Sequence, residues 1–294
     1  MKKINSPTVQ LFRQIWFQNY KGISITYLLI IIENICNLLQ AAAIGLAIDG
    51  LLKGNLSNFL PIFALWIIHL SVGLYRHVYD TKIFGDIYSR MAFDMVERQR
   101  ASGIEGNKIA GRVSLSREIV FFFETELPAI ATAAIYFIGA ITMLFIYDPF
   151  IGFFGLFIMI PIVLINRWFA RRAYRLNNGL NNRLEVQSDI IMHQPLSFVR
   201  RHFNRMQFWR ISISNTEAIT WGIVDIMVII LTVATLLRLT HLYGITVGTI
   251  YAIISYIWML KDAVNDIPVI VDNVSRVYDI GGRVAEKIET DHPE

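Results

Sequence analysis

The hydrophobic pattern of this chain is dominated by long uncharged runs separated by polar segments. The clearest pair, residues 127–146 and 150–165, contains no charged side chain and is broken at Tyr147-Asp148-Pro149. About 20 apolar residues, at a rise of 1.5 Å each, cross a hydrocarbon core of roughly 30 Å, and only a helix satisfies its own backbone there. Proline fixes φ and removes a donor, so the break predicts a turn. The pair therefore predicts two antiparallel membrane helices.

Further apolar runs have the same character. They cover residues 23–48, 59–78, 218–237 and a last run that begins at Ile245. Together the runs predict an all-α membrane protein with six transmembrane helices. Residues 8–20, which follow Ser6-Pro7, have the amphipathic pattern of a helix in the membrane interface, with Ser6 as N-cap and Pro7 in the first turn.

The polar segments differ greatly in length. Residues 50–58 and 238–244 are short connections, whereas residues 79–118 and 166–217 are long and contain helical periodicity. We expect the long segments to form two helical hairpins that project from the membrane. The expected organisation is an N-terminal segment (1–21), one six-span domain (22–283) and a tail (284–294).

Charge fixes the expected orientation. Of the 27 Lys and Arg residues, all but Lys53, Arg76 and Arg238 lie in the two long polar segments or near the termini. Basic residues mark the cytoplasmic side, so both termini and both hairpins are expected there. The chain is 54% hydrophobic and 17% charged, with a net charge of +4. Because the basic excess flanks apolar runs, we attribute it to topology and to membrane lipids, with no role in binding nucleic acid.

Several short motifs occur in a characteristic order. They are Gly111-Arg112-Val113-Ser114, Leu127-Pro128, Tyr147-Asp148-Pro149, Arg171-Arg172, and Ile245–Thr249 followed by Tyr256-Ile257-Trp258 and Pro268. With the unequal loops, they resemble the six-transmembrane domain of exporter-type (type 1) ABC transporters, specifically the stand-alone bacterial proteins that lack a nucleotide-binding domain.

The resemblance implies a transmembrane subunit in the bacterial inner membrane, working as a homodimer or paired with a similar membrane chain. The sequence contains no G-x-x-x-x-G-K-[S/T] phosphate loop. We therefore expect no enzymatic activity and no cofactor or metal bound by this chain, and ATP to act only through a separate nucleotide-binding ATPase subunit. The expected contact with that partner is the turn at His193, Gln194 and Pro195, together with Arg200 and Arg201.

Polar residues inside the predicted spans are the candidates for a transport site. Glu33, Asn37 and Gln40 recur at i, i+4 and i+7 and share one helix face. An ionisable group at this depth is expensive and by default faces a cavity or a partner. Two interpretations remain open, a substrate or proton-coupling site and a set of interhelical hydrogen bonds. His69 is either a titrating group or a packed neutral histidine.

Acidic residues also accompany the last two spans. Asp225 lies in the fifth run, and Asp262 and Asp266 are one turn apart in the sixth. The acidic stripe of the sixth span, Asp262 and Asp266, either attracts cationic cargo or forms a solvated helix end partly neutralised by Lys261. Near the start of span three, Glu124 and Glu126 are expected to pair with Arg76 or His77.

Three functional hypotheses follow. The chain is the membrane subunit of an exporter powered by a separate ATPase, an ATP-independent carrier in which Glu33, His69 or Asp225 takes up protons, or a non-transporting membrane scaffold. The sequence specifies neither the substrate nor the direction of transport.

Overall fold

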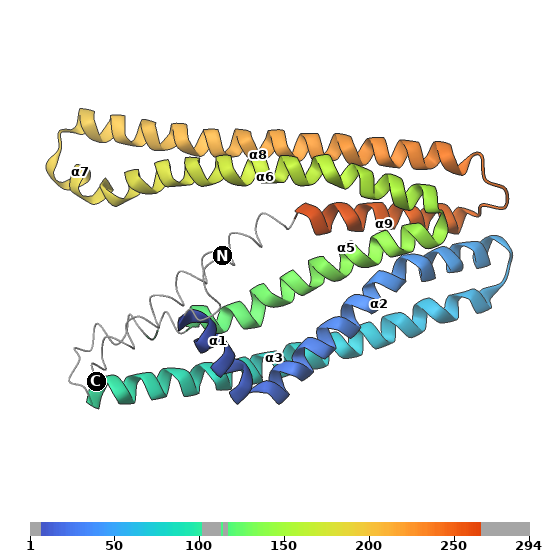
Figure 1. Ribbon diagram of the computed structural model, residues 1–294, viewed down its shortest axis with the longest axis horizontal. Coiled ribbons are helices and arrows are strands. Elements are labelled where there is room, and N and C mark those ends of the chain that lie inside the picture. Colours follow the sequence, from blue (N-terminus) through green and yellow to red (C-terminus); the bar gives the residue numbers. More distant parts are fainter. Residues whose placement is uncertain (1–6, 102–112, 114–116, 266–294) are drawn as a thin grey trace. The chain divides into compact units, whose positions relative to one another are not determined.

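A computed structural model describes residues 7–101, 113 and 117–265, and within this range the chain is helical (Figure 1). In chain order the helices are α1 (Pro7–Gln18), α2 (Tyr20–Leu52), the 3-10 helix η1 (Leu56–Phe59), α3 (Leu60–Ala101), the π-helix η2 (Phe122–Glu126), α5 (Leu127–Tyr147), α6 (Pro149–Glu185), α7 (Gln187–His193), α8 (Leu196–Leu239) and α9 (Val247–Asn265). Ser6, the loop around residue 106, Asp266 and the C-terminal tail lie outside the described residues.

Six helical stretches in the described residues are long and apolar enough to cross a membrane, which confirms the predicted all-α fold with six spans. Three helices continue far beyond their apolar runs, because α3 has 42 residues, α6 has 37 and α8 has 44. At 1.5 Å per residue these helices are about 55–66 Å long, roughly twice the hydrocarbon thickness. The expectation that the spans extend as continuous helices into the long polar segments is therefore confirmed for these three.

Local capping chemistry explains where the helices end. Asp148 is the N-cap of α6, where its side chain accepts a hydrogen bond from the Ile151 amide at 3.1 Å, and Pro149 occupies the first turn. The predicted turn between spans three and four is thus confirmed. Gly54 and Gly244 adopt positive φ values of 70° and 78° just after α2 and α8, a conformation that glycine reaches without a Cβ penalty.

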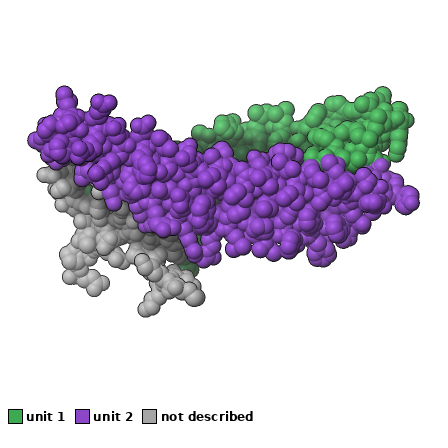
Figure 2. Space-filling model, turned by 90° about the horizontal axis from the view of Figure 1, so that it is seen from above, with its two compact units in different colours: residues 1–140, 246–255, 269–294 green, residues 141–245, 256–268 purple. Residues whose placement is uncertain are grey.

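The chain divides into two compact units, coloured separately in Figure 2. In the first unit (residues 1–140, 246–255 and 269–294), α2 packs along α3. The amphipathic helix α1 contributes Ile15 to a buried apolar cluster, and its Phe12 ring stacks on Phe122 of η2 with centroids 5.5 Å apart. The position of α1 relative to the membrane stays a prediction.

The beginning of α9 also belongs to the first unit, where it contacts α2 at two small residues. A Cβ built on Gly45 would lie 2.5 Å from the carbonyl oxygen of Gly248, so the two backbones approach more closely than side chains permit. Asp49, one turn further along α2, accepts hydrogen bonds from the Thr246 hydroxyl and the Gly248 amide. The motif at the start of span six is therefore an N-terminus capped by another helix.

The second unit comprises residues 141–245 and 256–268. Here α6 packs against α8, and α7 forms the turn between them (Figure 1). Ile162 of α6, Leu231 of α8, and Tyr256 and Leu260 of α9 are buried in this unit. At the opposite end of the α6–α8 pair from α7, Arg238 lies 3.4 Å from Asp148 and over the ring of Phe150.

Candidate functional site

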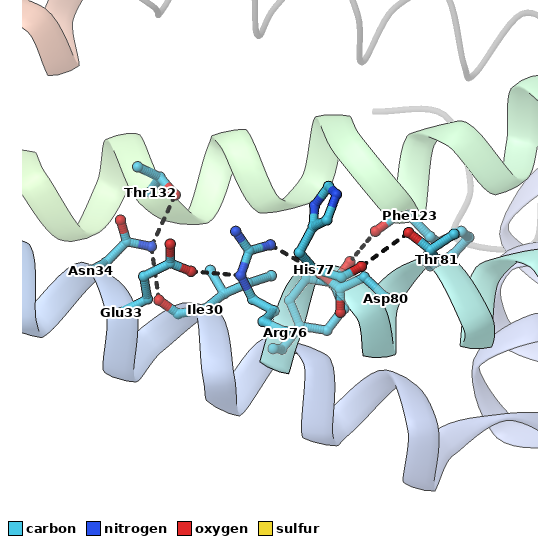
Figure 3. A network of polar contacts seen from close by, with 10 residues as sticks. Ile30, Glu33, Asn34, Arg76, His77, Asp80, Thr81, Phe123 and Thr132 are labelled. Atoms are coloured by element: carbon cyan, nitrogen blue, oxygen red, sulfur yellow. Dashed lines mark hydrogen bonds and ion pairs between the residues drawn. The ribbon is translucent and has the colours of Figure 1, made fainter. Parts of the chain in front are cut away.

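An ion triad joins α2 and α3 in the first unit (Figure 3). Arg76 Nε donates to Glu33 Oε2 at 2.5 Å, and Arg76 Nη1 donates to Asp80 Oδ2 at 2.9 Å. The side chains of Arg76 and Glu33 are 27% and 19% exposed, while Asp80 as a whole is 7% exposed. Since one guanidinium serves two carboxylates, the triad carries a formal charge of −1 when all three groups are ionised.

A row of amides continues the polar network toward α5. Asn34 Nδ2 donates to the Ile30 carbonyl oxygen and to Thr132 Oγ1 of α5 (Figure 3). One turn further along α2, Asn37 Nδ2 donates to Tyr136 Oη at 3.0 Å, and Gln40 Nε2 donates to Asn37 Oδ1 at 3.2 Å. The predicted stripe therefore forms interhelical hydrogen bonds and also borders the triad.

These side chains surround a cavity of about 220 Å³. Its lining residues come from α2, α3 and α5, and they are Ile30, Glu33, Asn34, Asn37, Arg76, Pro128, Ala129, Thr132 and Tyr136. The cavity thus combines one carboxylate, one guanidinium, amides, a hydroxyl and a phenol with a small apolar wall. Such a mixture suits a small polar ligand, because convergent polar groups in a partly apolar cavity are typical of binding sites.

The pairing predicted for Arg76 was wrong. Arg76 bonds to Glu33 and Asp80, whereas Glu124 lies 3.2 Å from Arg117, whose guanidinium also covers the ring of Tyr88. Arg76 belongs to α3 and lies at the level of the middle of α2, so it meets the carboxylate of the Glu33 stripe. An unpaired Glu33 in this position would be far more costly than the ion pair.

His69 lies on α3 two turns before Arg76 but does not line the cavity. Its Nδ1 is buried and has no hydrogen-bond partner among the described residues. The structure therefore separates His69 from the polar network of Glu33, and its role stays a prediction.

The acidic residues of the last two spans lie in the second unit. Lys261 Nζ lies 2.5 Å from Asp225 Oδ1 and 4.7 Å from the centre of the Trp258 ring. One of the two interpretations of Asp262 and Asp266 had Lys261 neutralise part of their charge; in the described residues Lys261 pairs with Asp225. Asp262 is exposed, and Asp266 lies outside the described residues.

The predicted partner-contact turn is an exposed helix end. α7 ends at His193, Gln194 is extended with ψ 151°, and Pro195 is the N-cap of α8. This matches the expectation that proline disfavours helix at the preceding residue. His193 Nδ1 lies 3.0 Å from Asp189 Oδ1, while Arg200 and Arg201 are exposed on the first turns of α8.

Sequence reasoning found one half of the polar site and missed the other. Glu33, Asn37 and Gln40 were predicted, whereas Asn34, Asp80, Thr132 and Tyr136 were not. The sequence did contain a usable signal. Arg76 and Asp80 have the i, i+4 spacing of an ion pair on a helix. Thr132 and Tyr136 have the same spacing, which places them on one helix face. In the part of the chain described, no group of three or more His, Cys, Asp or Glu side chains is placed to hold a metal ion.

Long apolar helices, two of them joined by an exposed turn, and a polar cavity among the spans together define a multi-pass membrane protein of the transporter type. Comparison with known protein families matches residues 12–248 to the ABC transporter transmembrane region. The chain belongs to this family, which confirms the resemblance to exporter-type membrane domains. A search of curated proteins found no significant match.

Proposed function

We propose that this chain is the transmembrane subunit of an ABC exporter whose ATP is hydrolysed by a separate nucleotide-binding subunit. Family membership supports the transport role, and the positive charge of the long polar segments supports cytoplasmic termini in the bacterial inner membrane. The working unit is a homodimer or a pair with a similar chain. In this assignment the chain itself has no ATPase activity and binds no cofactor.

The exposed end of the α6–α8 hairpin is the observation that carries this proposal. Met192 and Leu196 flank the turn and are 75% and 87% exposed. They extend from a helix pair that is much longer than its apolar run, so the turn lies well outside the membrane. Exposed apolar side chains beside His193 and Arg200 offer a patch that a soluble subunit covers.

A paired substitution at this turn tests the proposal. For this test the chain is expressed with an affinity tag in its native host, and the purified complex is assayed for ATP hydrolysis. Met192→Ser with Leu196→Ser should remove most of the co-purified ATPase activity while the yield and the melting temperature of the chain stay unchanged. Tyr174→Ser, an exposed residue of the same hairpin, serves as the matched control. Full ATPase activity in the double variant would contradict docking at the turn.

The ion triad favours a second candidate function, an ATP-independent carrier coupled to protons. Glu33 and Asp80 are carboxylates within long helices that contain apolar spans, the usual position of proton-relay groups. In this case the purified chain brings no ATPase with it, and transport into vesicles follows an imposed pH gradient. Glu33→Gln should then remove the dependence on the gradient, whereas an ATP-driven exporter should retain its dependence on ATP.

A further inference from the structure

The ion triad that borders the cavity contains one more carboxylate than guanidinium. Glu33 and Arg76 line the cavity, while Asp80 binds Arg76 from outside the lining. Among the described residues no other Lys, Arg or His side chain lines it. When all three groups are ionised, the triad keeps a formal charge of −1 in a partly buried position, which a cation in the cavity would offset. The cavity therefore favours an occupant that brings one positive charge.

Hydrogen-bond acceptor atoms beside the cavity also lack donors. Arg76 occupies Oε2 of Glu33, while Oε1 makes no hydrogen bond among the described residues and lies on the side of Gly73. Asn34 uses its amide nitrogen for both of its hydrogen bonds, which leaves its oxygen as a further acceptor. Acceptors without donors are what an ammonium group or another cation needs.

The volume and the lining of the cavity restrict the chemical class of the occupant further. A cavity of about 220 Å³ is on the order of seven times the volume of one water molecule in the liquid, much more than a bare alkali ion fills. Ile30, Pro128 and Ala129 contribute the apolar part of the lining. An organic cation with a small hydrocarbon body satisfies both parts of the lining.

We propose that the cavity between α2, α3 and α5 binds a small organic cation whose ammonium group lies beside Glu33. This inference rests on the proposed transport function, because it names the chemical class of the transported substrate. Binding of the cation can be measured on the purified chain without transport. An anionic ligand is disfavoured, since Arg76, the only cationic lining group among the described residues, is already shared by two carboxylates.

Probes of matched shape separate charge from size. The purified protein, in a maltoside detergent free of choline lipids, is titrated calorimetrically with choline, with its neutral isostere 3,3-dimethyl-1-butanol and with the zwitterion glycine betaine. Choline should bind at least about tenfold more tightly than the neutral isostere, with betaine weaker than choline. Equal affinities for choline and the isostere would overturn the inference. Displacement of choline by equimolar Na⁺ would overturn the organic character of the ligand.

Variants locate the site. Glu33→Gln keeps a hydrogen-bond acceptor for Arg76 and leaves a balanced Arg76–Asp80 pair, so the protein should fold and lose the preference for choline. Asp80→Asn, outside the lining, should weaken choline binding less. Asp86→Asn makes the same charge change at an exposed position of α3 and should leave binding unchanged. Wild-type choline affinity in folded Glu33→Gln would overturn the inference.

The two proposals fail separately. If the wild-type chain brings down no ATPase but retains choline selectivity, the exporter assignment alone is refuted. Absence of choline selectivity, with an ATPase that depends on Met192 and Leu196, refutes the cation site alone.

Discussion

Arg76 Nε lies 2.5 Å from Glu33 Oε2, although the two residues are 43 positions apart and belong to different helices. The contact joins the middle of α2 to α3 and places a formal charge pair among apolar spans. Asp80, the second carboxylate that Arg76 binds, lies one turn further along α3. The pair therefore acts both as a link between two helices and as the polar wall of the cavity.

Removal of the guanidinium should destabilise the protein. Arg76→Gln leaves Glu33 and Asp80 as two poorly hydrated carboxylates with no counter-ion, and breaking a buried pair costs about 3–5 kcal/mol. Because both side chains retain some exposure, we expect about 2–3 kcal/mol. The measurement is the midpoint of denaturation in detergent. Arg175→Gln, an exposed arginine of α6, is the control and should shift the midpoint little.

A compensating change tests the cause of that effect. In a double-mutant cycle, Glu33→Gln should recover a large part of the stability lost in Arg76→Gln, since only one carboxylate then remains. Strictly additive effects of the two substitutions would show that Arg76 stabilises the fold through packing and not through charge.

Features encoded by neighbouring residues were predictable from the sequence. The turn at Asp148-Pro149 follows from a cap and a proline, and the break at Gln194 follows from Pro195. The continuity of α3 and α6 follows from helical periodicity through the polar segments. Each of these properties is decided within a few residues of chain.

Features that depend on how one helix is rotated against another were not predictable in the same way. The periodicity of α2 placed Glu33, Asn37 and Gln40 on one face but did not say which helix that face meets. Arg76 and His77 were therefore expected to pair with Glu124 or Glu126, which have a similar expected depth. The bond between Asp49 and Thr246 joins residues 197 positions apart, and no local signal marks Asp49 as a cap.

Asp49 should stabilise the beginning of α9. Its carboxylate accepts from the Thr246 hydroxyl and from the Gly248 amide at 2.8 Å, which satisfies one of the free donors at that helix end. Asp49→Ala should destabilise the protein by about 1–2 kcal/mol, the usual range for loss of a cap. Asp49→Asn retains one acceptor and should lose less. Equal loss in both variants would contradict the capping role; Asp94→Ala, exposed on α3, is the control.

The charge distribution predicts which ends of the helices face the cytoplasm. Cys36 is the only cysteine and is buried, so Cys36→Ser gives a cysteine-free background. In that background Asn55→Cys and His241→Cys should react with a membrane-impermeant maleimide added to intact cells. Gln194→Cys should react only after the membrane is opened. Labelling of Gln194→Cys in intact cells would reverse the topology and remove the proposed docking turn from the cytoplasm.

The close approach of α2 and α9 gives the sharpest test of packing. A Cβ on Gly248 would overlap the backbone carbonyl of Gly45, which cannot rotate away, and would crowd the side-chain carboxylate of Asp49. Gly248→Ala should therefore push the helices apart and destabilise the protein by about 1–3 kcal/mol, the usual range for overpacking. It should also loosen the Asp49 cap, so that Gly248→Ala and Asp49→Ala combine to less than the sum of their separate effects.

Gly222 provides the matched control for this substitution. It lies within α8, and a Cβ built there meets no atom within 4 Å. Gly222→Ala should leave the protein unchanged or stabilise it by about 0.5–1 kcal/mol, because alanine loses less backbone freedom in a helix than glycine does. Thermal denaturation of both variants in the same detergent makes the comparison. If Gly248→Ala melts as high as Gly222→Ala, the two backbones do not meet at Gly45, and α9 begins elsewhere against α2.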